Sequence, residues 1–258
     1  MLLNASPDIR QQINDRHQLQ PRNSDPKRSS PIAAVVLTNA DVDHVAGLLS
    51  LRESQPFAVY AHERVLSVLA GNSIFNVLNP EHVARRALLL DTPIELRDAR
   101  DAPLGLRVTA FGVPGKVALW REDETDASLG TREGDTIGVE IRASDTMSMF
   151  YIPGCAAMTE ALAARLRGAA LVFFDGTLWR DDEMIAQGVG KKTGGRMGHM
   201  SCAGEMGSMA AFQALDVKRR IFIHINNTNP LLLPDSVERA EAEVRGWEVA
   251  YDGMEISL

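Results

Sequence analysis

The chain has 258 residues, 45% of them hydrophobic and 24% charged, with a formal net charge of -7 and a pI of about 5.4. This composition is ordinary for a globular protein with a substantial core, and no cluster of basic residues suggests a nucleic-acid partner. The longest apolar stretches, such as IAAVVL, match a buried strand and are too short to cross a bilayer.

The two cysteines show no CxxC spacing, and no charged-then-apolar leader opens the sequence. We therefore expect no disulfide framework, and we expect a cytoplasmic location. Cys155 and Cys202 are interpreted as small buried hydrophobic residues rather than metal ligands.

In chain order, strand-like apolar runs alternate with helix-like segments. Strands are predicted at 32–37, 57–60, 106–113, 136–143, 147–152, 171–175, 220–225 and in the terminal segment 248–256. Helices are predicted after His44, at about 62–70, 158–166 and 204–214, and after Pro234. The acidic stretch 121–135 is interpreted as a solvated loop, and the glycine-rich stretch 176–201 as a functional or mobile one. Mixed strands and helices predict one α/β domain of layered sheets with helices outside.

The segment TNADVDH follows the first of these strands. It places Asn39, Asp41, Asp43 and His44 at the carboxyl edge of a sheet, where α/β proteins bind ligands. Carboxylates and an imidazole in one short turn can converge on a divalent cation. An aspartate that caps the following helix explains Asp41 or Asp43 equally well when either is considered alone.

Three further sites have similar residues at strand ends or in loops. The strand RIFIHI reaches His224, the strand LVFFD ends in Asp175, and the glycine-rich stretch carries His199. A satisfied core histidine is the alternative for His224. Four strand-end or loop sites with His or Asp are more than chance would supply, and they can act together only if the fold brings them to one place.

The spacing Asn39-x-Asp41-x-Asp43-His44-x-x-Gly47 resembles the HxHxDHxxG loop of the metallo-β-lactamase superfamily, with both leading histidines replaced. Along nearly the whole chain, TNADVDHVAGLL, VPGKVALW, GTLWRDDEM, MGHMS and HINNTNPLL resemble the pyrroloquinoline quinone (PQQ) biosynthesis protein B family. The resemblance implies a metallo-β-lactamase-like αββα sandwich, in which helices flank two mixed β-sheets over residues 1–258.

Members of that family begin with a glycine-rich strand and a cysteine cluster that binds a structural zinc. This sequence starts at MLLNASPD, where that segment has already ended, and neither cysteine matches the cluster. We therefore expect a single domain that lacks the family's first strand and structural zinc site. A missing strand would expose a sheet edge.

Asn39 is a poor zinc ligand, so the dinuclear zinc centre of superfamily hydrolases is disfavoured. Asp43, His44 and His224 supply two imidazoles and one carboxylate, the composition of the facial triad in non-haem Fe(II) oxygenases. The resemblance also implies an enzyme that uses Fe(II) and molecular oxygen to hydroxylate the tyrosine ring of a Glu-Tyr precursor of PQQ. Zinc is a possible alternative metal, since these ligands accept both.

In this interpretation Asp41, Asp175 and His199 are catalytic candidates, each as a ligand, a proton carrier or an orienting residue. Lys191, Lys192 and Arg196 could bind the carboxylates of the precursor, although a solvated basic loop explains them equally well.

Two other functions remain open. A hydrolase that uses metal-bound hydroxide needs Asp41 in place of a histidine. A non-catalytic carrier would bind PQQ or its precursor and aid its transport to the periplasm. Other PQQ biosynthesis proteins are possible partners in each case.

Overall fold

The computed structural model describes residues 1–22, 25, 29–118 and 132–257. The chain forms two compact units: Met1–Phe111 with Val117–Ile137, here the N-terminal unit, and Gly112–Lys116 with Gly138–Leu258, the C-terminal unit. Most of the predicted acidic loop, 121–131, lies outside the described residues. Among the described helices, none is long and apolar enough to cross a membrane.

The N-terminal unit is built on a parallel sheet with the order β1-β2-β3-β4. Its strands are β1 (Leu2–Leu3), β2 (Ala34–Val36), β3 (Phe57–His62) and β4 (Val83–Leu88). Its helices are α1 (Ile9–Asp15), α2 (Val42–Val45), α3 (Glu63–Gly71) and the 3-10 turns η1 (His17–Leu19), η2 (Ala46–Leu51) and η3 (Ser73–Val77). An antiparallel hairpin of β5 (Pro93–Arg97) and β6 (Pro103–Gly112) follows.

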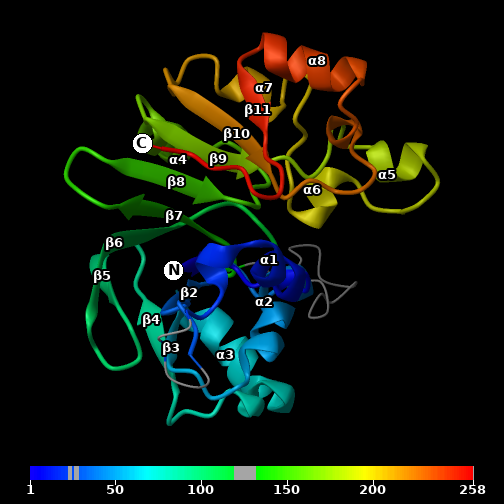
Figure 1. Cartoon of the computed structure of the whole chain (residues 1–258). Coiled ribbons are helices and arrows are strands. Elements are labelled where there is room, and N and C mark those ends of the chain that lie inside the picture. Colours follow the sequence, from blue (N-terminus) through cyan, green and yellow to red (C-terminus); the bar gives the residue numbers. More distant parts are fainter. Residues whose placement is uncertain (23–24, 26–28, 119–131, 258) are drawn as a thin grey trace. The chain divides into compact units, whose positions relative to one another are not determined.

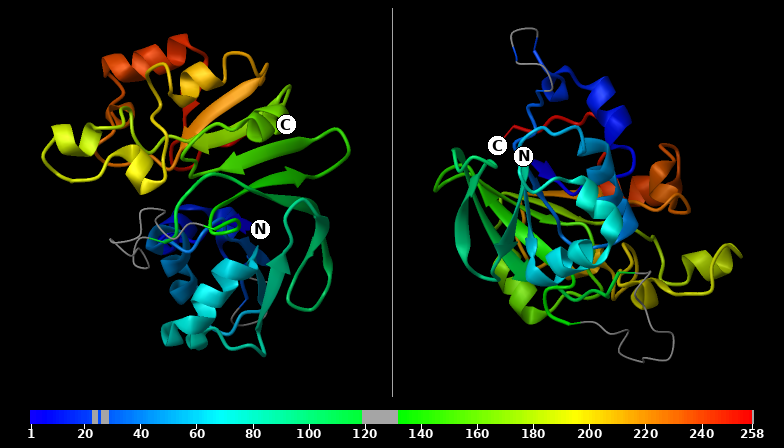
Figure 2. Two further views of the ribbon diagram at one scale, coloured as in Figure 1. Left: turned by 180° about the vertical axis from the view of Figure 1, so that it is seen from behind. Right: turned by 90° about the horizontal axis from the view of Figure 1, so that it is seen from below.

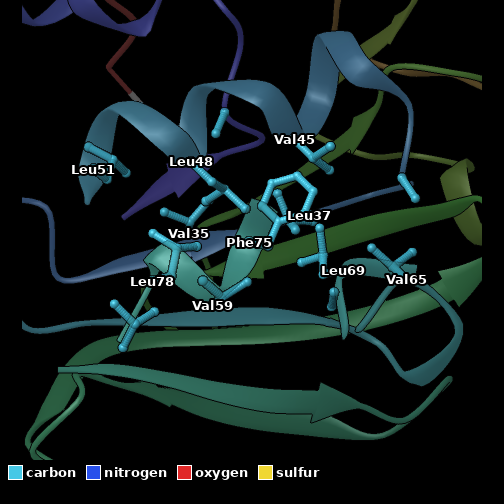
Figure 3. Packing of buried hydrophobic residues seen from close by; sticks show 14 of the residues in the cluster. Val35, Leu37, Val45, Leu48, Leu51, Val59, Val65, Leu69, Phe75 and Leu78 are labelled. Carbon is cyan, nitrogen blue, oxygen red and sulfur yellow. The ribbon is translucent and has the colours of Figure 1, made fainter. Parts of the chain in front are cut away.

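Alternate residues of β2 and β3 bury one face of this sheet against the helices. Val35 and Val59 point into the same cluster as Leu48 and Leu69 (Figure 3), and all four are fully buried. Burial of such a side chain stabilises the fold by about 1.5–3 kcal/mol. The helices of this unit are therefore held to the sheet mainly by apolar contact.

The C-terminal unit contains strands in the order β7-β8-β9-β10-β11, with β7 and β8 antiparallel and the later pairs parallel. The strands are β7 (Ile137–Arg142), β8 (Ser148–Ile152), β9 (Leu171–Asp175), β10 (Arg219–Ile223) and β11 (Trp247–Val249). The helices are α4 (Glu160–Leu166), α5 (Glu183–Ala186), α6 (Gly194–Met197), α7 (Ser208–Ala211), η5 (Pro230–Leu232) and α8 (Val237–Val244). Figure 1 labels these strands and α-helices, and Figure 2 shows them from two further sides.

Aromatic side chains form the centre of this second core. The Trp247 ring stacks on Phe222 with centroids 4.0 Å apart, and Phe212 meets Trp247 edge-on at 4.9 Å. Phe212 also meets Phe174 edge-on at 4.9 Å. Because Phe174 precedes Asp175 and Phe222 lies two residues before His224, this packing fixes the strand ends that carry the site.

Most predicted elements are present, including the hairpin of β7 and β8. Strands β1, β4 and β5 were not predicted. Strand β4 was missed because adjacent arginines interrupt the apolar pattern of VARRAL. In the structure the Arg85 guanidinium donates to the Phe75 carbonyl at 3.0 Å, and Arg86 donates to the Tyr60 hydroxyl at 2.9 Å. These hydrogen bonds allow two charged residues within a strand.

Other predictions were wrong in extent. The helix expected at 204–214 is only α7, since Gly204 has φ +89° and a Cβ on Gly207 would lie 2.3 Å from the Ala203 carbonyl oxygen. The terminal strands reduce to β11. Strand β10 ends at Ile223, so His224 follows the strand rather than ending it.

Gly47, in the turn after His44, allows the N-terminal segment to pass close to η2. Its amide donates to the Ala5 carbonyl at 2.9 Å, and the Ala5 amide donates to the His44 carbonyl at 2.7 Å. A Cβ on Gly47 would lie 2.1 Å from the Ser6 carbonyl oxygen. The glycine of this loop is therefore required for close backbone packing.

We predict that Gly47→Ala lowers the free energy of unfolding by about 1–3 kcal/mol, the usual range for overpacking. Gly71→Ala is the matched control, since a Cβ there meets nothing within 4 Å at the end of α3. Urea denaturation would measure both. Equal stability of the two variants would contradict the close-packing role of Gly47.

Candidate metal centre

The loop after β2 carries the first group of predicted site residues. The Asn39 side-chain oxygen accepts a hydrogen bond from the Asp41 amide at 2.9 Å, so Asn39 shapes the turn. Asp41 is the N-cap residue of α2. Within the described residues, its side chain accepts no capping hydrogen bond from the backbone amides of the first helical turn. The capping interpretation therefore does not explain its carboxylate.

Asp43 and His44 lie in the first turn of α2. The His44 Nδ1 and Asp43 Oδ1 atoms are 3.2 Å apart, with the imidazole 4% and the carboxylate 55% exposed. A buried imidazole beside an accessible carboxylate has the donor types that divalent transition metals accept.

Asp175, at the end of β9, is fully buried. Its Oδ1 accepts hydrogen bonds from the Thr177 amide at 3.0 Å and the Thr177 hydroxyl at 2.6 Å. Its Oδ2 accepts one from the Cys155 amide at 2.8 Å and lies 2.7 Å from His199 Nδ1. A carboxylate offers about four acceptor positions, so these four contacts use them all.

Thr177 connects this carboxylate to His224. The Thr177 Oγ1 atom lies 2.7 Å from His224 Nδ1, 3.0 Å from the His224 carbonyl oxygen and 3.0 Å from His199 Nδ1. His224 has φ +55°, a left-handed conformation that costs a non-glycine residue about 1–3 kcal/mol. The backbone after β10 is thus turned so that the imidazole reaches Thr177.

His199 is positioned by the short helix α6. Thr193 caps this helix by accepting from the Arg196 amide, and Gly198 ends it with φ +85°. The His199 amide then donates to the Gly194 carbonyl at 2.9 Å. This part of the glycine-rich stretch is a hydrogen-bonded support and not an open loop.

Within the C-terminal unit the two imidazoles lie side by side. The His199 and His224 rings have centroids 5.2 Å apart and planes inclined by 20°. Potential donor atoms of Asp175, His199 and His224 all lie within 4.8 Å of one another. The imidazole nitrogens suit a transition metal, whereas the oxygens of Asp175 are already used.

The charges of this cluster compensate one another. Burial by itself raises the pKa of Asp175, but the imidazoles of His199 and His224 and the Thr177 hydroxyl offset it and hold the pKa below its ordinary value. Asp175 is therefore a carboxylate at neutral pH, and a buried carboxylate is stable only with such partners.

Both cysteines are free and buried, as predicted. Burial, with the negative charge of Asp175, raises the pKa of Cys155 to about 12, and the same two causes raise that of Cys202 well above its ordinary value. Neither thiol is available as a thiolate ligand at neutral pH.

The predicted residues thus fall into two groups. Asp175, His199 and His224 form one cluster in the C-terminal unit, whereas Asn39, Asp41, Asp43 and His44 share a loop of the N-terminal unit. A shared metal ion for Asp43, His44 and His224 stays a prediction. Of the remaining basic candidates, Lys191 and Lys192 precede α6 and Arg196 lies within it; Lys191 and Arg196 are exposed and Lys192 is half-buried.

Sequence reasoning missed Thr177, which contacts every member of the cluster in the C-terminal unit. The available signal is its place two residues after a strand-terminal aspartate, a spacing typical of a side chain that closes a local turn. The Cys155 amide was also missed, and no sequence pattern indicates it because the donor is backbone.

A family profile described as "Beta-lactamase superfamily domain" matches residues 1–225. The chain is 53% identical to coenzyme PQQ synthesis protein B of Xanthomonas oryzae pv. oryzae and 51% identical to that of Bradyrhizobium diazoefficiens. Each match covers 100% of this chain and 83% of the relative.

A crystal structure of Zn²⁺-bound PqqB from Methylobacterium extorquens superposes with a TM-score of 0.92 at 50% identity, covering 99% of this chain and 82% of that one. The predicted fold, α/β of the metallo-β-lactamase type with two sheets flanked by helices, is confirmed. The chain belongs to the coenzyme PQQ synthesis protein B family of the β-lactamase superfamily.

Proposed function

We propose that this protein acts in the biosynthesis of pyrroloquinoline quinone as an iron-dependent oxygenase that hydroxylates the tyrosine ring of a Glu-Tyr precursor. The observation that carries the proposal is the pair of stacked imidazoles, His199 and His224, supported by the buried Asp175 in a member of this family. Histidines held in this way are typical of metal centres, where a carboxylate orients the ligand ring.

The proposed iron ligands are Asp43, His44 and His224, by their residue types and the family resemblance. Two imidazoles and one carboxylate favour Fe(II) with open positions, and Fe(II) bound there would supply the activation of molecular oxygen. Asp175 acts as an orienting residue, since hydrogen bonds from Cys155 and Thr177 and the contact with His199 use its acceptor positions.

His199 is the proposed proton carrier of the site. Its imidazole is 14% exposed, and its Nδ1 atom lies 2.7 Å from the carboxylate of Asp175, a hydrogen-bonding distance. Asp41, in the loop after β2, is the second candidate for this role.

A dinuclear hydrolase is less well supported. The Asn39 side-chain oxygen accepts from the Asp41 amide, and an amide oxygen engaged in a turn does not replace an imidazole ligand. Zinc in the Methylobacterium extorquens relative fits the same donor types, because imidazole and carboxylate bind both metals.

We predict that the protein loaded anaerobically with Fe(II) adds one oxygen atom to the ring of a Glu-Tyr peptide when oxygen is admitted. His224→Ala should abolish the product, whereas His82→Ala, which removes an imidazole from the turn before β4, should retain it. Mass spectrometry of a single turnover measures the added oxygen, and metal analysis of each variant reports iron occupancy.

Two outcomes would contradict the proposal. Peptide hydrolysis supported by Zn²⁺ as well as Fe(II) would favour the hydrolase, because zinc does not activate oxygen. Absence of reaction, with PQQ binding that survives His224→Ala, would favour the carrier that aids transport to the periplasm.

We further propose that Lys191, Lys192 and Arg196 bind the carboxylates of the precursor. Because Lys191 and Arg196 are exposed, each contact contributes about 0.2–1 kcal/mol, roughly a 1.4- to 5-fold change in affinity. We predict that Lys191→Met and Arg196→Met each raise KM by that factor without changing kcat.

Steady-state kinetics at low salt would measure the effect, with Lys218→Met as the control, since this exposed lysine pairs with Asp216. An unchanged KM in the double variant Lys191→Met/Arg196→Met would assign the two residues to a solvated loop.

A further inference from the structure

The contacts of the Thr177 hydroxyl restrict which ring nitrogen of the neighbouring histidines carries hydrogen. Its hydroxyl has one hydrogen to donate, yet four acceptor or imidazole atoms surround Oγ1 at 2.6–3.0 Å: Asp175 Oδ1, His224 Nδ1, His199 Nδ1 and the His224 carbonyl oxygen. Only one of these contacts can use the Thr177 proton, so the others need a proton from the partner or remain weak.

The shortest contact identifies the acceptor. The Thr177 Oγ1 and Asp175 Oδ1 atoms are 2.6 Å apart, whereas Oγ1 and the His224 carbonyl oxygen are 3.0 Å apart. A hydroxyl donates more strongly to a carboxylate than to a neutral carbonyl, and 2.6 Å is the usual length of such a bond. A carboxylate has no proton to give back, so the hydrogen lies between Thr177 and Asp175.

The proton on His224 follows from this assignment. Its Nδ1 lies 2.7 Å from Thr177 Oγ1, whose single hydrogen is already donated to Asp175. Nδ1 must therefore carry the hydrogen and donate it to Oγ1. A bare Nδ1 would leave two acceptors in contact.

His199 also carries its hydrogen on Nδ1, because this atom contacts Asp175 directly. Its Nδ1 lies 2.7 Å from Asp175 Oδ2, an acceptor, so Nδ1 donates there directly. Both rings then carry hydrogen on Nδ1, and in the neutral imidazole Nε2 is the atom with the free lone pair.

We propose that Thr177 is a positioning residue that relays the orienting effect of Asp175 to His224, fixing this imidazole in the Nδ1–H tautomer, in which Nε2 carries the lone pair that would bind a metal. His199 receives the same effect from Asp175 by direct contact. This inference rests on the proposed metal site but does not depend on hydroxylation of the precursor.

The local backbone supports the role of Thr177. The Asn226 amide donates to the Thr177 carbonyl at 3.1 Å, and the Gly176 amide donates to the Ile223 carbonyl at 2.8 Å. These bonds join the turn after β9 to the turn after β10, where His224 has its positive φ. The threonine is thus held against the histidine by backbone on both sides.

The test uses Thr177→Val, which keeps the branched shape and removes the hydroxyl, and Thr177→Ser, which keeps the hydroxyl. In metal-free protein labelled with ¹⁵N-histidine, long-range ¹H–¹⁵N spectra report which nitrogen of each ring carries hydrogen. We predict an Nδ1–H tautomer for His224 in the wild type and in Thr177→Ser, and a shift toward Nε2–H in Thr177→Val.

His199 is the internal control, because its acceptor Asp175 Oδ2 is unchanged in all three proteins. Zn²⁺ affinity, measured by competition with a chelator, should fall about 10- to 100-fold in Thr177→Val, the usual loss when an orienting partner is removed. It should recover in Thr177→Ser. Circular dichroism and thermal unfolding check that each variant folds.

An Nε2–H tautomer for His224 in the wild type would overturn the inference without any variant. Thr177→Ser binding Zn²⁺ as weakly as Thr177→Val would also overturn it. Neither measurement uses oxygen or peptide. If both support Thr177 while no hydroxylated product forms, the positioning role stands and the proposed oxygenase function fails.

Discussion

The arrangement of the C-terminal unit depends on one buried carboxylate. Leaving an unpaired charge at the position of Asp175 would cost several kcal/mol, so the fold must supply donors around it. It does so from three places along the chain: the Cys155 amide, the amide and hydroxyl of Thr177, and the His199 ring. The turn after β9, the start of the segment after β8 and the end of α6 therefore have to meet at one point.

The structure of the N-terminal unit depends on a different constraint, which is close backbone packing. There the site loop is fixed by backbone contacts that a side chain at Gly47 would block, and Asn39 closes the turn before α2. Apolar packing of the helices on β2 and β3 supplies much of the stability of this unit. The polar loop at the strand end carries an exposed carboxylate at Asp43 beside the buried imidazole of His44.

Periodicity was sufficient to predict most of the strands, and their polar ends singled out Asp175 and His224, whereas the αββα sandwich followed from the family resemblance. That Asp175, His199 and His224 form one cluster was not predicted. Strand β4 escaped prediction because Arg85 and Arg86 are satisfied only by tertiary hydrogen bonds, which a local pattern does not contain. The left-handed turn at His224 was hidden for a similar reason, since residues other than glycine rarely adopt it. Thr177 was missed because its importance arises from the tertiary meeting of two turns.

The raised pKa of Cys155, about 12, makes its thiol resistant to oxidation. Oxidants attack the thiolate form of cysteine, and a thiol with this pKa is almost entirely protonated in a cell. The buried carboxylate of Asp175, which accepts a hydrogen bond from the Cys155 amide, also suppresses ionisation of the Cys155 sulfur. The sulfur therefore stays in the thiol form, which oxidants attack slowly.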